Sequence, residues 1–338
     1  MSDKLARIHW QMGQALLPEH LVALEDSILA ETRARAHLIG LPNYGIGHLS
    51  WNEALLSDGI LSILAMTLVL PSGQLFDIPK NAKAKSFNMN LAGTTSVPVY
   101  LHIIEDAQGS EEMATLAQEE ESVERLYAHI EISSDQNHAS ARHSIRLAEF
   151  QKDAQGTWKI SDQYIPPLLQ VGTSPFLGDT LNYMVQLLEA FHFKLSQEIT
   201  ASHLSGENLF SAKQCLQGIY KLQHFMCNLK GNVHYHPYYL YETLKFFYID
   251  LCLYQNCTPE TIDVPYHHDQ LADCFRKVID PILAQMKTMK SQAPYLPFKK
   301  SEGMFTIAKL PKEAIDAKEV YFLIQKPKVT TTDRKSVV

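Results

Sequence analysis

The stretch 176–199 reads FLGDTLNYMVQLLEAFHFKLSQEI, and the pattern of the sequence changes at this point. Its apolar residues recur every three or four positions, at Leu181, Met184, Val185, Leu188, Phe191, Leu195 and Ile199. Side chains at this spacing lie on one face of an α-helix. The residues before the stretch form short runs between turns, whereas those after it keep the helical period. The stretch therefore separates an expected β part from an expected helical part.

Three further segments carry the helical period, at residues 207–230, about 236–254 and about 269–290. Gly231 and Asn232 form a stop signal after the first of them, and Pro237 suits the first turn of the second. Pro281 falls inside the third segment and is expected to kink it. Four long helices with short links predict a four-helix bundle over residues 173–297.

The N-terminal part, residues 1–172, consists mostly of short runs between turn residues. After an opening strand at 6–10, Pro18 begins an expected helix with Leu21, Leu24, Ile28 and Leu29 on one face. Further strands are expected at 60–64, 67–70, 97–104, 126–132 and 144–151, and the exit of a hairpin at 156–160. Many short strands with regular turns predict an antiparallel β-sandwich. The fold class is therefore multidomain α+β.

Two segments each carry an excess of one charge. Residues 105–124 are rich in Asp and Glu and contain no Lys or Arg, with a spacing that matches no EF-hand loop. They are expected to form a mobile, solvated connection between strands. Residues 298–338 carry more Lys and Arg than Asp and Glu, with expected strands at 305–310 and 319–325. Two strands are not a stable domain, and residues 328–338 are expected to be disordered.

Composition narrows the class of protein. Hydrophobic residues make up 46% and charged residues 20% of the 338 residues, as in a soluble globular protein with more than one domain. The net charge of −7 provides no basic field for nucleic acid. The longest apolar run, 60–70, is about half the ~20 residues that a membrane span needs. Without the apolar segment of a signal peptide at its start, the protein is expected in the cytoplasm.

Motifs of catalysis are absent from the sequence: there is no P-loop, GxGxxG, HExxH or GxSxG. The five cysteines, expected to be reduced, buried thiols, form no CxxC pair. A nucleophile at Cys252, Cys257 or Cys227, the last near His224, is an alternative interpretation. A thiol in an apolar helix stripe is more often an inert core residue. No catalytic residue and no cofactor is expected.

A histidine cluster is the strongest candidate for a metal site. His234 and His236 form an HxH pair, and His267 and His268 are adjacent in sequence. Four such imidazoles suit zinc or a similar metal. Both pairs also fall at expected helix starts, where histidines cap and pack the helix. The spacing differs from that of structural zinc sites, so the capping interpretation is favoured.

Three groups of residues resemble a known protein family. The run 8–21 reads IHWQMGQALLPEHL, a Trp, then a Gly, then a run similar to LxPQHF. The run 70–79 reads LPSGQLFDIP and follows Trp51 and Gly59. The runs 236–244, HPYYLYETL, and 265–271, PYHHDQL, come later in the chain. In this order they resemble the TssK family, also called VasE or ImpJ, of bacterial type VI secretion baseplate proteins. The resemblance covers residues 8 to about 325.

The resemblance implies an architecture and a function. It implies a β-sandwich at 1–172 similar to the shoulder domain of phage receptor-binding proteins, then the bundle, then a C-terminal head at 298–338. It implies a homotrimer without enzymatic activity or direct membrane insertion, in which the β domain holds the baseplate wedge. The head would contact the cytoplasmic domains of the membrane complex, at the inner face of the bacterial inner membrane.

Candidate contact residues follow from the resemblance and from apolar patterns. Docking of the wedge is expected at Trp10, Leu16, Leu17, Pro18 and His20, in and beside a loop with exposed-looking apolar residues. Bundle or trimer contacts are expected at Tyr239, Phe246, Phe247 and Tyr248, because these aromatic residues lie on different sides of one helix.

The sequence departs from the family pattern in its C-terminal part. Family members continue well beyond the bundle, whereas this sequence stops after two expected head strands. We therefore expect the chain to enter baseplates but to bind the membrane complex weakly. Two other functions stay open at this point: a histidine-ligated metalloenzyme, and a phage-like receptor-binding or adhesin subunit.

Overall fold

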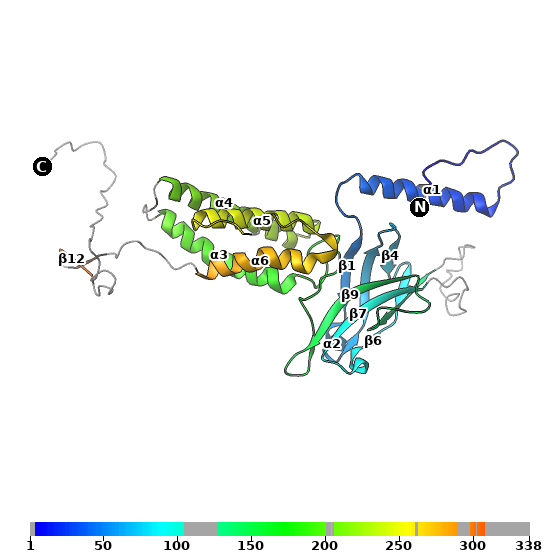
Figure 1. Cartoon of the computed structure of the whole chain (residues 1–338), viewed down its shortest axis with the longest axis horizontal. Coiled ribbons are helices and arrows are strands. Elements are labelled where there is room, and N and C mark those ends of the chain that lie inside the picture. The colour runs from blue at the N-terminus through cyan, green and yellow to red at the C-terminus, as the bar shows by residue number, and fades with distance from the viewer. Residues whose placement is uncertain are drawn as a thin grey trace. The chain divides into compact units, whose positions relative to one another are not determined.

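The computed structural model describes residues 4–104, 127–200, 204, 206–260, 263–288, 298–301 and 303–307 (Figure 1). The chain divides into two compact units, Met1–Lys287 and Thr288–Val338. The first unit contains a helix, then strands, then long helices, so the fold is mixed α+β. The expected order of a β part followed by a helical part is confirmed.

A three-stranded antiparallel sheet opens the β part, in the order β1-β3-β4. Two shorter strands, β2 and β6, pair with each other beside short helices. The bounds are β1 (Gly45–Trp51), α2 (Glu53–Ser57), β2 (Ile60–Leu61), β3 (Ile63–Val69), β4 (Leu75–Ile78), β6 (Phe87–Asn88) and the 3-10 helix η1 (Met89–Ala92).

A five-stranded sheet completes the β part, in the order β10-β9-β7-β8-β5. Its pairs are antiparallel except for the parallel pair of β5 and β8. The bounds are β5 (Ala82–Ala84), β7 (Ser96–Ile104), β8 (Ala128–Ser133), β9 (His143–Lys152) and β10 (Trp158–Ile160). The central strand β7 buries every second residue completely, at Val97, Val99, Leu101 and Ile103.

The two sheets share a core. Trp51 of β1 meets Phe150 of β9 with ring centroids 5.5 Å apart, and Phe176 lies 6.5 Å from the same Trp51 ring. All three side chains are buried. Aromatic rings of this size dominate the energetics of a core. Phe176 thus connects the sheets to the segment that starts the helical part.

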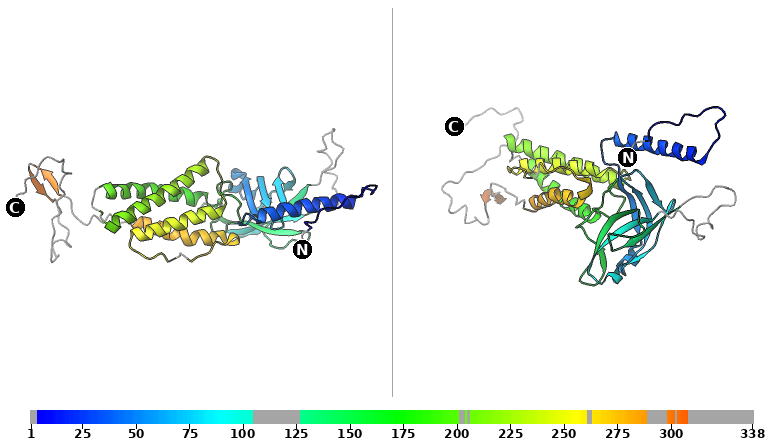
Figure 2. Two further views of the ribbon diagram at one scale, coloured as in Figure 1. Left: turned by 90° about the horizontal axis from the view of Figure 1, so that it is seen from above. Right: turned by 45° about the vertical axis from the view of Figure 1, so that its right-hand side comes forward.

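Four long helices follow the sheets and run side by side (Figures 1 and 2). In α3 the buried residues Leu181, Met184, Leu188, Phe191 and Leu195 confirm the expected apolar stripe. α4 ends at Lys230, directly before the expected stop signal of Gly231 and Asn232, and Asn232 has φ of 61°. The bounds are α3 (Gly178–Thr200), α4 (Gly206–Lys230), α5 (Pro237–Tyr254), the 3-10 helix η3 (His268–Gln270) and α6 (Leu271–Thr288), which contains Pro281.

Some local predictions are wrong. Residues 6–10 form no strand, because no neighbouring strand pairs with them among the described residues. The strands expected at 60–64 and 67–70 have other bounds, because residues 60–70 contain the two-residue β2 and the seven-residue β3. No strand is predicted from the sequence at β1, because Gly45 ends a run of turn residues at 41–45. Gly45 has φ of 119°, and a Cβ on it would lie 2.4 Å from the Pro167 carbonyl oxygen.

The second unit contains the hairpin of β11 (Lys299–Ser301) and β12 (Met304–Thr306). The strand expected at 305–310 overlaps β12 in part. The strand expected at 319–325, the disorder expected at 328–338 and the acidic connection expected at 105–124 lie outside the described residues.

Candidate protein-binding surfaces

The residues before α1 (Pro18–His37) form a loop held together by their own side chains. The Leu17 N–H donates to Nδ1 of His20 at 3.2 Å, and Nε2 of His20 lies 3.1 Å from the side-chain nitrogen of Gln14. The Trp10 ring meets the His20 ring edge to face, with centroids 5.7 Å apart. Leu17 is the N-cap and its apolar side chain cannot cap the helix, so His20 satisfies a free backbone donor at the helix start.

The apolar face of α1 is uncovered by the described part of the chain. Only Ser27 is buried in this helix, while Leu21 is 51% exposed and Ile28 is 56% exposed. Leu17, Leu21, Leu24 and Ile28 alternate spacings of four and three residues, the pattern along which helices pack on other helices. Covering the exposed part of these side chains favours association, by about 25 cal/mol for each Å² of apolar area before the entropic costs of binding. The face is therefore suited to binding another protein.

The five residues expected to dock the wedge come together at the start of α1. Trp10, Leu16 and Leu17 are exposed, with Leu16 the most exposed of them at 64%. Pro18 is the first residue of the helix. His20 is half-buried, and both of its ring nitrogens face groups of the same loop. His20 therefore shapes the loop, and the three apolar residues are the ones available for contact.

The four aromatic residues predicted in α5 divide into two pairs. Tyr239 and Phe246 are exposed, the latter at 61%. Phe247 and Tyr248 are buried inside the subunit, so they are contacts among the helices of one chain and not surface residues. The helical turn separates Phe246 from Phe247 by about 100° around the axis, which places neighbouring residues on different faces.

A groove of about 320 Å³ between α4 and α5 borders Phe246. Its floor contains Gly218, where a Cβ would lie 2.9 Å from Oδ2 of Asp250. The missing side chain allows the two helices to approach closely. Burial raises the pKa of the Asp250 carboxyl, and the positive charge of Lys221 opposes this shift. The groove thus combines an aromatic rim with charges of both signs.

Two of the predicted histidines join the β part to the helices. His236 is the N-cap of α5, and its Nδ1 accepts from the Tyr238 N–H at 3.2 Å while its Nε2–H donates to the Pro42 carbonyl at 3.0 Å. His268 lies on it, with ring centroids 5.1 Å apart, and its Nε2–H donates to the Tyr44 carbonyl at 2.8 Å. This confirms the capping interpretation for His236.

The hydrogen bonds of these rings leave them unsuited to a shared metal ion. Nδ1 of His268 bonds the Tyr266 hydroxyl at 2.8 Å, so both nitrogens of both rings have protein partners. His234 bonds the Val171 carbonyl, and His267 is exposed. Within the described ranges, no group of three or more His, Cys, Asp or Glu residues is arranged to hold a metal ion.

Burial lowers the pKa of His236 to about 4, and the neighbouring His268 ring contributes to the shift. Burial also lowers the pKa of His268. A buried imidazole resists protonation because its charged form loses hydration. Both rings are therefore neutral where they bind the backbone of the loop 42–44. We call the pair of His236 and His268 the histidine clasp.

The cysteines are all free, and the expectation that all five are buried is wrong for two of them. Cys215, Cys252 and Cys274 are buried, whereas Cys227 and Cys257 are exposed. Cys257 follows the end of α5 instead of lying in its apolar stripe. Burial raises the pKa of the Cys215 and Cys274 thiols, which disfavours the nucleophilic thiolate.

Two features of these surfaces were missed from the sequence. Tyr44 donates its hydroxyl to Asp269 at 2.9 Å beside the histidine clasp, although the two are far apart in the chain. Arg33 of α1 lies over the turn after β3, where a Cβ on Gly73 would come within 2.5 Å of its Cγ. Gly73 was recognised only as a turn residue, and no local pattern indicates that a helix lies against it.

No helix among the described residues is both long enough and apolar enough to cross a membrane.

Comparison with known proteins places this geometry in a family. The sequence matches the family described as bacterial Type VI secretion, VC_A0110, EvfL, ImpJ, VasE, over residues 20–141 and 114–336. It is 23% identical over 303 residues to the type VI secretion system baseplate component TssK1 of Pseudomonas aeruginosa strain PAO1. That alignment covers 81% of this chain and 67% of the relative.

Solved structures share the fold. A chain of the TssK-TssF-TssG baseplate subcomplex superposes with a TM-score of 0.63 at 17% identity, covering 84% of this chain and 99% of that one. A crystal structure of TssK gives a TM-score of 0.62 at 20% identity, covering 83% and 72%. The family match spans most of the sequence, including both the β part and the helices. The chain therefore belongs to the VasE/ImpJ family of bacterial type VI secretion proteins.

Proposed function

We propose that this chain is a structural subunit of the type VI secretion baseplate, without enzymatic activity, that links the baseplate wedge to the membrane complex as a homotrimer. Its family membership supports the secretion role. The relative TssK1 is a baseplate component, and the similar solved chain assembles with TssF and TssG. The assignment places the protein in the cytoplasm, at the inner face of the inner membrane.

The proposal assigns one role to each of three regions. Residues 1–172 form a β-sandwich that docks the wedge, and the contact of Trp51 with Phe150 between the two sheets supports this packing. Residues 173–297 form a four-helix bundle that trimerises. In support, His192 of α3 meets Tyr220 of α4, and Tyr241 of α5 meets Phe275 of α6. Residues 298–338 begin the head that contacts the membrane complex.

The single observation that carries wedge docking is the uncovered apolar surface at the start of α1. Trp10, Leu16 and Leu17 are exposed in a loop that its own hydrogen bonds hold in shape. A pre-shaped apolar surface loses little conformational entropy on binding, so its burial contributes directly to affinity. Contiguous exposed apolar residues in a folded protein commonly mark a protein-binding site.

The test is capture of the cognate TssF and TssG proteins by the tagged chain. Leu17→Asp and Leu16→Asp are expected to reduce capture at least tenfold, because each places a charge in an apolar interface. Leu91→Asp is the matched control, since Leu91 is 82% exposed in η1, away in sequence from the α1 loop. Asp is also a favourable N-cap residue, so Leu17→Asp should leave α1 intact.

Two results would overturn this assignment of the surface. One is undiminished capture by both variants, and the other is equal loss in the Leu91→Asp control. Failure of the unmodified chain to capture TssF and TssG would overturn the baseplate function itself. Circular dichroism and gel filtration of each variant separate loss of binding from loss of fold.

Trimer formation is proposed to use the exposed aromatic residues of α5. Tyr239 and Phe246 present large apolar area to solvent in the single subunit. Light scattering after gel filtration should give about three times the subunit mass of 38.3 kDa at micromolar concentration. Phe246→Asp should shift the mass towards the monomer, and a monomeric parent protein would contradict the proposal.

A further inference from the structure

A short connection crosses the central strand of the large sheet. β8 and β9 flank β7 and both run antiparallel to it, so they run parallel to each other. Ser133 at the end of β8 lies opposite Tyr100, and His143 at the start of β9 lies opposite Ile103. A parallel crossover usually takes about a dozen or more residues. The shorter connection 134–142 must therefore lie close against β7.

A histidine of β7 lies beneath this connection. His102 shares a strand face with Tyr100, opposite the alternating core residues, yet its side chain is completely buried. His138 of the connection stacks on it, with ring centroids 5.0 Å apart and planes inclined by 27°. Among the histidines of the described part of the molecule, only His102 has no accessible surface. The connection thus shields a titratable group from water.

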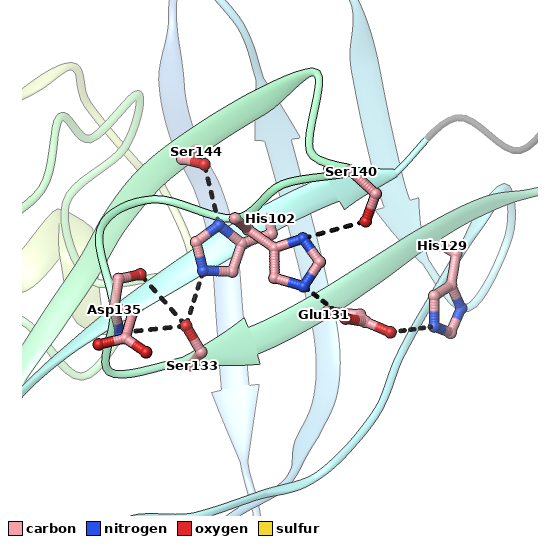
Figure 3. A network of polar contacts seen from close by, with 8 residues as sticks. His102, His129, Glu131, Ser133, Asp135, Ser140 and Ser144 are labelled. Atoms are coloured by element: carbon pink, nitrogen blue, oxygen red, sulfur yellow. Dashed lines mark hydrogen bonds and ion pairs between the residues drawn. The ribbon is translucent and has the colours of Figure 1, made fainter. Parts of the chain in front are cut away.

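The hydrogen bonds determine which nitrogen of His102 carries the proton. Figure 3 shows the ring between the hydroxyls of Ser133, at 2.8 Å from Nε2, and Ser144, at 2.9 Å from Nδ1. The Ser133 hydroxyl donates to the Asp135 carbonyl and accepts from the Asp135 N–H, both at 3.1 Å. Because its only proton is used there, Ser133 accepts from the His102 Nε2–H. Nδ1 then accepts from Ser144, and the ring is neutral.

The charged groups around His102 act on its protonation in opposite directions. On the connection, Nε2 of His138 lies 3.0 Å from Glu131 of β8, which is also 3.7 Å from His129. A charged His138 would be held by Glu131 and would repel a charge on His102. The other ionisable or charged groups near the ring are Asp135 and Arg142 of the connection, Tyr100 of β7, and His143 and Arg146 of β9.

Burial and the neighbouring His138 ring have the largest effects on the pKa of His102. Together they lower the pKa of His102, whereas the carboxylates of Glu131 and Asp135 and the Asp135 backbone act in the opposite sense. Protonating Nδ1 would also require the Ser144 hydroxyl to turn its proton away. When the connection opens, the ring regains water and its ordinary affinity for protons. Acid therefore favours the open form, because the open form binds the proton more tightly.

We propose that His102 and His138 form a proton-sensitive latch that holds the connection 134–142 over β7 and releases it when His102 is protonated. The latch is a conformational device of the β part and does not depend on the proposed baseplate function. Acid uncovers the outward face of β7 without unfolding the sheet, whose core residues lie on the other face.

Hydrogen–deuterium exchange of the full chain, followed by mass spectrometry, tests the latch. The open fraction of 134–142 should rise up to about tenfold between about pH 7.5 and about pH 5.5, after correction for intrinsic exchange rates. A peptide covering β1 should show no such change. His102→Gln keeps one donor and one acceptor but cannot be charged, so its connection should lose the acid response. His48→Gln, at an exposed histidine of β1, should keep it.

A second readout serves if His102→Gln does not fold. Exchange at the histidine Cε1–H in the parent protein follows each imidazole separately, and His102 should titrate below the ordinary imidazole pKa of about 6.5. Equal protection of 134–142 at both pH values would overturn the latch. So would an acid response retained in folded His102→Gln, or a titration of His102 at the ordinary imidazole value.

Discussion

α1 and α5 both begin with a proline and carry apolar residues at helical spacing, but these residues are mostly buried in α5 and mostly exposed in α1. α5 buries Leu240, Leu244, Phe247 and Leu251 almost completely. α1 buries only Ser27. A histidine lies at the start of each helix, and the two rings differ in the same way. His236 reaches across to the Pro42 carbonyl, whereas His20 bonds only within its own loop.

An apolar stripe therefore predicts a helix and a contact, but not the molecule that supplies the contact. In α5 the contact comes from neighbouring helices of the same chain. In α1 the described part of the chain supplies none for most of the stripe, which is why this face is the proposed docking surface.

The largest effect is expected inside α5. Phe247→Ala should lower the free energy of unfolding by about 3–5 kcal/mol, because it leaves a cavity in a closely packed interior. Phe210→Ala, at an exposed phenylalanine of α4 outside the proposed trimer contact, is the matched control and should cost less than about 1 kcal/mol. Urea denaturation at one fixed protein concentration measures both. Equal losses would contradict the different burial of these two side chains.

The second largest effect is expected from the two histidines at helix starts, whose replacement should change the stability by different amounts. His236→Ala removes the α5 cap and leaves the Pro42 carbonyl without its donor, at a cost of about 1–3 kcal/mol. His20→Ala removes only the side chain that accepts from the Leu17 N–H near the surface, and it should cost less than about 1 kcal/mol. Thermal unfolding of the two variants compares them. A larger loss in His20→Ala would show that the α1 loop is as integral to the fold as the histidine clasp.

Acid should weaken the clasp before it affects α1. The unfolded chain protonates this histidine near pH 6.5, whereas the pKa of His236 in the folded chain is about 4. The stability that His236 contributes is therefore complete above about pH 6.5 and is lost as the pH falls towards 4. The loss is on the order of 1 kcal/mol, since water screens a half-buried ring. Denaturation midpoints at several pH values measure it.

His236→Asn separates the cap from the titration. Asn accepts a backbone hydrogen bond at the N-cap but has no titratable proton in this range. Its stability should therefore change less between about pH 7 and pH 5 than that of the parent protein. An identical pH dependence in His236→Asn would assign the acid sensitivity to other groups.

The smallest effect is expected in α1. Ile28→Ala should change the unfolding free energy of the free protein by less than about 0.5 kcal/mol, because the side chain is already largely in water. The same variant should weaken the proposed capture of TssF and TssG, because Ile28 lies on the same face as Leu17 and Leu21. A loss of 2 kcal/mol or more in the free protein would mean that α1 is already covered, for example by another copy.

The sequence alone determined the features that depend on neighbours along the chain. Helical spacing located α3 to α6, and Pro237 with the histidine before it located the start of α5. Gly231 and Asn232 located the end of α4. The order of a β part and a helical part also followed. These features are local, because a helix closes its hydrogen bonds within four residues and its caps act within one turn.

Only the tertiary structure decided which apolar and polar residues find partners. Phe246 and Phe247 are alike in sequence but opposite in exposure. β1 is a strand because β3 pairs with it, and the alternating run around His102 gave no sign that the connection 134–142 would cover that ring. Strand pairing and burial join residues that are distant in the chain, so no local pattern specifies them. The bare face of α1 is the clearest case, since its stripe alone does not tell whether the same chain or another protein covers it.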